Sequence, residues 1–188
     1  MYSVIIALMS SGEFNTFSTR PMDRKINFHA VREGDFVVAD YSPELPYVAT
    51  MGLFTCKAIA VHSRESGRGL LAHLSHTRML DFDIERLVRQ FGDGFEAATV
   101  QIVQTQQSQD EVKWPSSDTI AEELSRYAPA SIAIDRNTEG REIRGVALDL
   151  ADGILYELDN ETADVWHGSV DFSGTTPISP QFSAFKSR

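Results

Sequence analysis

The sequence is poor in cysteine and has no long apolar run. Cys56 is the single cysteine in 188 residues, which excludes an intramolecular disulfide and a four-cysteine zinc site. This cysteine usage is typical of a reducing compartment and favours a cytoplasmic protein. No apolar run approaches the ~20 residues that span a bilayer, so we expect no membrane insertion. The apolar residues 1–9 lack a basic flank and are a weak signal peptide, which favours a buried strand or a terminal arm.

Positive charge is also scarce. The chain has 17 Lys and Arg against 27 Asp and Glu, which gives a net charge of -10. Such a charge repels phosphate backbones and anionic membranes, so nucleic acid is a poor candidate for a partner. Hydrophobic residues make up 42% and charged residues 23%, values typical of a globular chain. The length then predicts one compact domain, followed after Asn160 by an irregular appendix rich in Gly, Ser, Thr and Pro.

Two segments have the apolar spacing of a helix. The first follows Asp81 and ends at Gly92, with apolar residues at i, i+3, i+4 and i+7: Ile84, Leu87, Val88 and Phe91. The second starts near Thr119, which with Glu122 forms a plausible capping box, and it is closed by Pro129.

The remaining pattern consists of short runs rich in β-branched residues. The predicted strands span residues 36–39, 57–62, 70–75, 99–103, 131–135, 143–148 and 154–158. The last two are joined by a hairpin loop with Gly153 at the position that needs positive φ. Many strands with few helices predict an α+β fold, a single domain of mostly antiparallel β-sheets or a sandwich, flanked by two or three helices.

A predicted hairpin places the single thiol near an imidazole. If His62 faces Gly69 across the loop 63–68, then Ala58 faces His73, and Cys56 is a diagonal neighbour of His73 on the same face. A histidine beside a thiol lowers the pKa of the thiol and can protonate a leaving group. We expect Thr50 to accept the second imidazole N–H, and the backbone N–H groups of Thr55 and Cys56 to stabilise an oxyanion.

Two other interpretations of these residues remain open. A free cysteine is usually a small buried hydrophobe, and a lone histidine is usually a structural one. A zinc site would need ligands from Cys56, His62, His73 and His76. His73 and His76 are three apart, however, and point to opposite faces of a strand unless a bulge intervenes.

The segment from Thr50 to Cys56, followed by His73, resembles a known family. Thr50-Met51-Gly52-Leu53-Phe54-Thr55-Cys56 keeps the Thr, the first Gly, the Cys and the spacing to the His of the CheD-type chemoreceptor glutamine deamidases, which are related to deamidase toxins of the cytotoxic necrotizing factor type. The order of helices and strands downstream is also similar, and Arg144 keeps the position of the family's arginine in the late loop. The resemblance covers residues 26–160, which implies an N-terminal extension of residues 1–25 and an appendix of residues 161–188.

The resemblance implies a cysteine-dependent protein-glutamine deamidase. Cys56 would be the nucleophile, His73 the base and Thr50 the residue that holds the ring, with no metal or organic cofactor. The partner would be a protein that presents a glutamine, such as a chemoreceptor or another signalling protein. Phe54 and Thr55 replace the family's Gly-Ser, which motivates an alternative, a catalytically inert interaction module. A second alternative is a secreted effector that deamidates a host protein.

Overall fold

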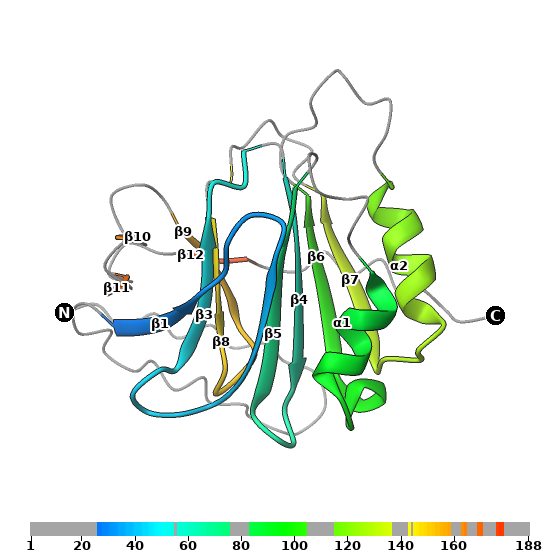
Figure 1. Ribbon diagram of the computed structural model, residues 1–188, viewed down its shortest axis with the longest axis horizontal. Helices are drawn as coiled ribbons and strands as arrows, with labels where there is room; N and C mark the ends of the chain where they lie inside the picture. The colour runs from blue at the N-terminus through cyan, green and yellow to red at the C-terminus, as the bar shows by residue number, and fades with distance from the viewer. Residues whose placement is uncertain are drawn as a thin grey trace, which may run out of the picture.

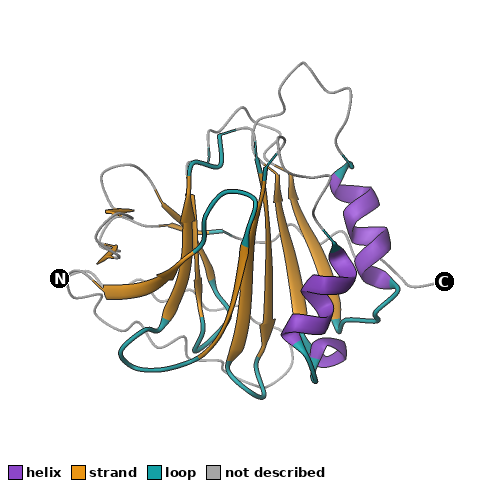
Figure 2. Cartoon of the chain, viewed as in Figure 1, coloured by secondary structure: helices purple, strands orange, loops and turns teal. Residues whose placement is uncertain are grey.

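The computed structural model describes residues 26–54, 56–75, 83–104, 115–136, 143 and 145–158, with the short segments 163–164, 169–170 and 176–178. The predicted extension 1–25 lies outside these residues, as do Thr55, His76 and Arg144. The described chain forms three layers, in which the helices cover one sheet and a second sheet packs against the other face of the first (Figures 1 and 2). None of the helices in this part of the chain is long and apolar enough to cross a bilayer.

The sheet under the helices has five strands in the order β2-β5-β4-β6-β7. Their bounds are Phe36–Asp40 for β2, Lys57–Ser63 for β4, Arg68–Leu74 for β5, Thr99–Gln104 for β6 and Ser131–Arg136 for β7. All neighbours are antiparallel except β6 and β7, which are parallel and are joined through a helix. Along β4 the odd-numbered side chains face the helices and the even-numbered ones face the second sheet.

The second sheet has seven strands in the order β10-β11-β1-β3-β8-β9-β12. The longer ones are Ile26–Ala30 for β1, Tyr47–Met51 for β3, Gly145–Asp149 for β8 and Leu155–Leu158 for β9. Three short ones, Ala163–Asp164 for β10, Ser169–Val170 for β11 and Thr176–Pro177 for β12, come from the predicted appendix. Ile178 is buried in the core between the sheets, so this part of the appendix packs with the domain.

The two helices lie close to the predicted positions. Helix α1 spans Ile84–Phe91 and buries Ile84, Leu87 and Phe91 against the five-stranded sheet, ending at Gly92 with φ 80°. Helix α2 spans Ser117–Ser125, with a single turn of 3-10 helix, η2 (Phe95–Ala97), earlier in the chain.

The predicted capping box at Thr119 was wrong. The N-cap of α2 is Ser116, whose Oγ accepts the backbone N–H of Thr119 at 3.0 Å. Ser116 stands earlier in the chain and can cap an extra half-turn that buries Ser117, so the helix begins there.

The α+β class and the helices flanking mostly antiparallel sheets are confirmed. The hairpin between β8 and β9 is also confirmed, with Gly153 at φ 77°. The prediction missed β1 and β3. Residues 47–50 of β3 are buried on both faces, so this strand has no alternation of apolar and polar residues to reveal it.

Candidate active site

The β4–β5 hairpin has the register expected from the sequence. His62 pairs with Gly69 and Ala58 pairs with His73. A four-residue turn joins the strands, and Gly67 within it has φ 65°. His73 therefore lies on the inner face of the five-stranded sheet, near the end of β5 remote from this turn.

Thr50 and His73 meet across the space between the two sheets. Thr50 lies on β3 of the seven-stranded sheet, and its Oγ1 is 2.8 Å from Nδ1 of His73. The same Oγ1 donates its proton to the carbonyl oxygen of Val31 at 2.9 Å. Both side chains are buried, with exposed fractions of 0% for Thr50 and 1% for His73. The expected contact between the threonine and the ring is thus present.

These hydrogen bonds assign the tautomer of His73. A hydroxyl has one proton, and Thr50 gives it to Val31, so Thr50 can only accept from the ring. Nδ1 then carries the proton and Nε2 has the lone pair. Nε2 is buried and has no hydrogen-bond partner among the described residues. A buried, unsatisfied imidazole nitrogen is costly in a structural histidine and suits a base that takes a proton from a neighbouring group.

Cys56 shares the face on which His73 lies. Its side chain packs in the core between the sheets with Ala58 and Ala60 of β4 and with Leu71, two positions before His73. Since Ala58 pairs with His73, extending β4 by one residue would make Cys56 the diagonal neighbour of His73, a position for which the Cβ atoms are expected to lie roughly 7 Å apart. The thiol is 4% exposed.

The backbone before Cys56 forms a tight turn. The N–H of Cys56 donates to the carbonyl oxygen of Leu53 at 2.6 Å, and Gly52 has φ 81°, which allows the chain to leave β3 abruptly. In this conformation the N–H of Cys56 is therefore hydrogen-bonded inside the turn, and its role as an oxyanion donor stays a prediction. Phe54, at the corner, is 45% exposed and does not lie buried over the sulfur.

Gly145 supports Thr50 from the neighbouring strand. It pairs with Met51 on β3, and a Cβ at this position would overlap the Met51 side chain and the carbonyl oxygen of Thr50. The close approach of β8 to β3 therefore needs glycine here and fixes the backbone that carries Thr50.

His62 does not belong to this site. It lies near the turn end of the hairpin, four residues along β4 from Ala58, which is about 13 Å. Its Nε2 donates to the carbonyl oxygen of Leu150 at 3.0 Å, and Gly153 packs against its ring. His62 is thus a structural link between the sheets. Within the described segments, no group of three or more His, Cys, Asp or Glu side chains could hold a metal ion.

Burial dominates the electrostatics of His73. Burial lowers the pKa of His73 below its usual value, and the carboxylate of Glu33 opposes this effect in part. Glu33 lies in the loop between β1 and β2 and accepts a hydrogen bond from Ser75. Nothing in the sequence distinguishes Glu33, because a charged residue before Gly34 is typical of an exposed turn.

This pKa shift predicts a pH dependence of stability. As the pH falls below ~6.5, His73 is protonated in the unfolded chain before it is protonated in the folded chain. The free energy of unfolding should therefore decrease by at most about 1.4 kcal/mol for each unit of pH decrease, until the folded chain also binds the proton. Urea unfolding at several pH values measures the slope. His73→Gln should flatten the slope below pH ~6.5. Equal slopes in the wild type and His73→Gln would contradict the shift.

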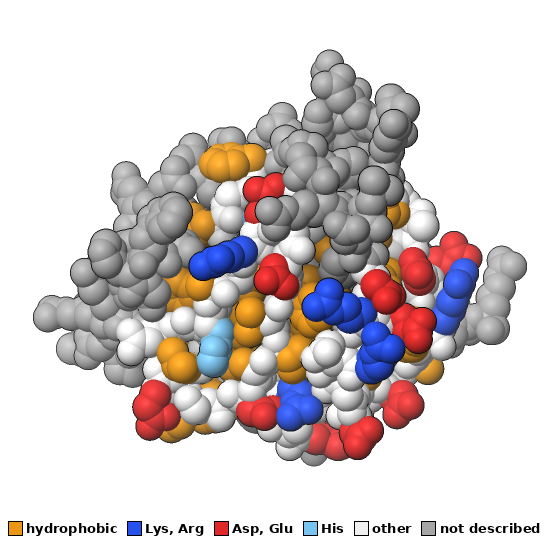
Figure 3. Space-filling view, viewed as in Figure 1, with side chains coloured by type: hydrophobic (Ala, Val, Ile, Leu, Met, Phe, Trp, Pro, Cys, Tyr) orange, Lys and Arg blue, Asp and Glu red, His pale blue; other side chains and the backbone are white. Residues whose placement is uncertain are grey.

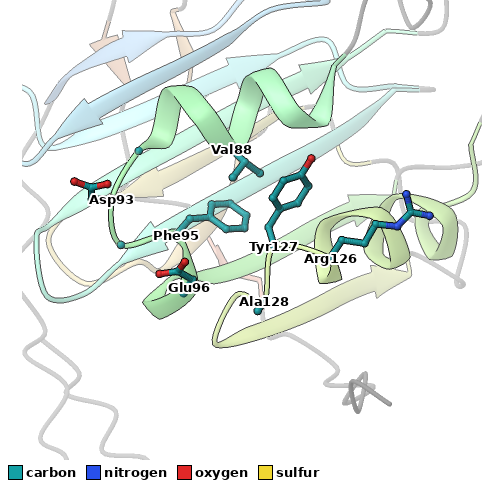
Figure 4. Close-up of a pocket in the computed structure, with 9 residues that line it drawn as sticks. Val88, Asp93, Phe95, Glu96, Arg126, Tyr127 and Ala128 are labelled. Atoms are coloured by element: carbon teal, nitrogen blue, oxygen red, sulfur yellow. The ribbon is translucent and has the colours of Figure 1, made fainter.

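A separate hollow lies at the other end of the five-stranded sheet. It is lined by the end of α1, by η2 and by the turn after α2, and Arg68 of the β4–β5 hairpin donates to the carbonyl of Phe91 close by. This end of the strands is opposite the one that carries Cys56 and His73. Figure 4 shows Val88, Phe95 and Tyr127 close together while Arg126 points away. The rings of Phe95 and Tyr127 pack edge to face with 6.4 Å between their centroids, so the floor of this hollow is aromatic, and charged side chains such as Asp93 and Glu96 stand at its rim.

Comparisons with known proteins leave the site to be interpreted from its geometry. Neither models of protein families nor curated proteins give a match to this chain. The surface charge does not indicate a ligand either, because acidic and basic side chains are interspersed over the helical side of the face shown in Figure 3. The arrangement of Cys56, His73 and Thr50 is therefore the principal guide to function.

Proposed function

We propose that the chain is a cysteine-dependent amidohydrolase that converts a glutamine side chain of a protein to glutamate and releases ammonia. One observation carries this proposal. Nδ1 of His73 is hydrogen-bonded to Thr50, while Nε2 is buried and has no partner in the described part of the chain, on the face that also holds the chain's single thiol. A nucleophile, a base and a group that orients the base are the minimum for covalent hydrolysis of an amide.

The reaction would proceed in two halves. Nε2 of His73 takes the proton of Cys56, the sulfur attacks the carboxamide carbon, and the tetrahedral intermediate collapses to a thioester as His73 gives the proton to the departing ammonia. Water then attacks the thioester carbon, with His73 again taking a proton. The carbon–sulfur bond breaks and the proton returns to Cys56. Thr50 keeps the Nδ1 proton throughout, which holds the ring and its tautomer.

The choice of glutamine depends on the resemblance to the CheD-type deamidases between Thr50 and His73. On that basis the substrate is a protein that presents a glutamine, such as a chemoreceptor or another signalling protein in the cytoplasm. The reaction needs no metal or organic cofactor, because sulfur and imidazole supply the nucleophile and the proton transfers.

The direct experiment measures amide hydrolysis by the full chain. The protein is incubated with a library of glutamine-containing peptides and with a folded helical receptor domain, and both ammonia and conversion of Gln to Glu are followed, the latter by mass spectrometry. We expect ammonia and glutamate in equal amounts. The proposal is rejected if the glutamine peptides and the receptor domain remain unchanged and if Cys56 is alkylated with the pH dependence of a free thiol.

A second candidate function is favoured by one observation. Phe54 is exposed while Cys56, two residues later, is almost fully buried. An exposed aromatic ring at a turn is a typical anchor of a protein interface. The chain would then bind a signalling protein through this turn without chemistry. Loss of partner binding in Phe54→Ser, with binding intact in Cys56→Ala, would favour this function if no glutamine is converted.

A further inference from the structure

The loop between β1 and β2 is built against the end of β5 that carries His73. The N–H of Gly34 donates to the carbonyl oxygen of His73 at 2.8 Å, and the N–H of His73 donates to the carbonyl oxygen of Asp35 at 3.0 Å. The carbonyl of Val31, at the start of the same loop, accepts the proton of Thr50. One loop thus fixes the backbone of His73 and the hydroxyl that holds its ring.

The same loop places a carboxylate beside the site. Ser75 follows His73 by two positions and is 1% exposed, and its Oγ donates to Oε1 of Glu33. The register of β4 and β5, continued by one residue beyond the Lys57–Leu74 pair, places Ser75 opposite Cys56. The buried hydroxyl of Ser75 therefore anchors the exposed carboxylate of Glu33 at the end of β5 that carries His73.

The proposed mechanism places a positive charge on a buried ring. When Cys56 gives its proton to His73, the ring becomes a cation, and its Nδ1–H meets only the neutral hydroxyl of Thr50. The thiolate balances this charge at first, but the sulfur loses its negative charge when it attacks the substrate, and a buried imidazolium is then costly unless another anion lies nearby. In a catalytic triad that contains a carboxylate, the residue that orients the histidine also supplies this negative charge. Thr50 orients His73 here, and its hydroxyl is neutral, so the charge must come from another residue.

Other ionisable groups near the ring are few in the described part. Lys57 lies on the helix side of β4, facing away from the space between the sheets. Glu157 is in the row of Thr50 on the seven-stranded sheet but two strands away, about 10 Å. The side chain of Asp35 turns back to accept the N–H of Phe36. Glu33 is the carboxylate whose field acts on His73.

We propose that Glu33, held by Ser75, is a positioning residue that stabilises the thiolate–imidazolium pair of Cys56 and His73. The inference rests on the proposed function and deepens it. The proton moves from Sγ of Cys56 to Nε2 of His73, and Glu33 takes no part in the transfer. The carboxylate acts through His73 by its charge and does not touch the substrate.

The test is the rate of alkylation of Cys56 by iodoacetamide as a function of pH. Glu33→Gln keeps an acceptor for Ser75 and removes only the charge. We expect its inflection to move to higher pH and its rate at neutral pH to fall about fivefold, less at high salt. Glu65→Gln, in the turn at the other end of the hairpin, removes the same charge and should leave the profile unchanged. In the His73→Gln background, Glu33→Gln should no longer slow the alkylation, because the imidazolium that the carboxylate stabilises is absent.

The outcomes separate this inference from the proposed function. One outcome is a wild-type inflection that lies well below the free-thiol value of ~8.5 and is the same in Glu33→Gln. That result would overturn the role of Glu33 but would still support Cys56 and His73 as the catalytic pair. A wild-type profile like that of a free thiol would overturn both. Ser75→Ala should produce a smaller shift in the same direction as Glu33→Gln, because it releases the carboxylate without removing it. A Ser75→Ala profile identical to wild type would reject the hydroxyl as the group that holds Glu33.

Discussion

The Cys56→Ala variant is expected to lose glutamine conversion by a factor of about 10⁴ or more, which is ~5.5 kcal/mol of transition-state stabilisation. The sulfur forms the covalent bond to the substrate, and the nearby hydroxyls cannot replace it. Thr50 donates to Val31 and Ser75 donates to Glu33, so both protons are already committed. Conversion of Gln to Glu by mass spectrometry measures the loss.

The fold should survive this substitution. Cys56 is a small side chain at the edge of the core between the sheets, and replacing it with alanine should cost roughly 1 kcal/mol. Thermal unfolding provides the control, and Cys56→Ser provides a polar variant of nearly the same shape. A Cys56→Ala protein that converts glutamine at the wild-type rate would exclude covalent catalysis by sulfur.

The sequence could predict the hairpin because its determinants are local. The turn fixes which residues of β4 and β5 pair, and the alternation of a strand then decides which share a face. From His62 opposite Gly69 it follows that His73 pairs with Ala58, as observed. Helix α1 was predictable for the same reason, since its apolar stripe and terminal glycine lie within ten residues.

Contacts between the sheets were harder to derive. Thr50 lies on β3, a strand without alternation, and its contact with His73 joins two sheets that the sequence does not place relative to each other. The motif predicted this contact. The hydrogen bond from Thr50 to the carbonyl of Val31, and the tautomer of His73 that follows from it, can be seen only in the structure. The hydrogen bond from Cys56 to Leu53, which occupies the expected oxyanion donor, depends on a turn geometry that several sequences could adopt.

Glu33 shows a further limit of the sequence. Arg32, Glu33 and Asp35 surround Gly34, a pattern typical of a solvated turn. Only the hydrogen bond from the buried Ser75 distinguishes Glu33 from its neighbours. Side chains that act through a distant partner have no local pattern, so electrostatic support of a site is the feature least accessible from sequence.

His73→Gln is expected to lower glutamine conversion by about 10³-fold, because one residue serves as base and as acid in both halves of the reaction. The thiol of Cys56 should then titrate near the free-thiol value of ~8.5, which leaves only a few per cent thiolate at neutral pH. The rate of Cys56 alkylation against pH measures this change without a substrate. Retention of a low inflection in His73→Gln would mean that another group activates the sulfur.

Substitutions of Thr50 test whether the orientation of the His73 ring contributes to the rate of glutamine conversion. Thr50→Val keeps the shape but leaves the Nδ1–H of His73 and the carbonyl of Val31 without their shared partner, so we expect conversion to fall by about 10- to 100-fold. Thr50→Ser restores a hydroxyl and should recover most of the rate. Serine lacks the methyl group of threonine that packs in the core. If Thr50 only fills space, the order should therefore be reversed, with the valine variant closer to wild type than the serine variant. The ranking of these two variants, measured as the conversion rate and as the pH profile of Cys56 alkylation, decides whether Thr50 positions the base or only fills space.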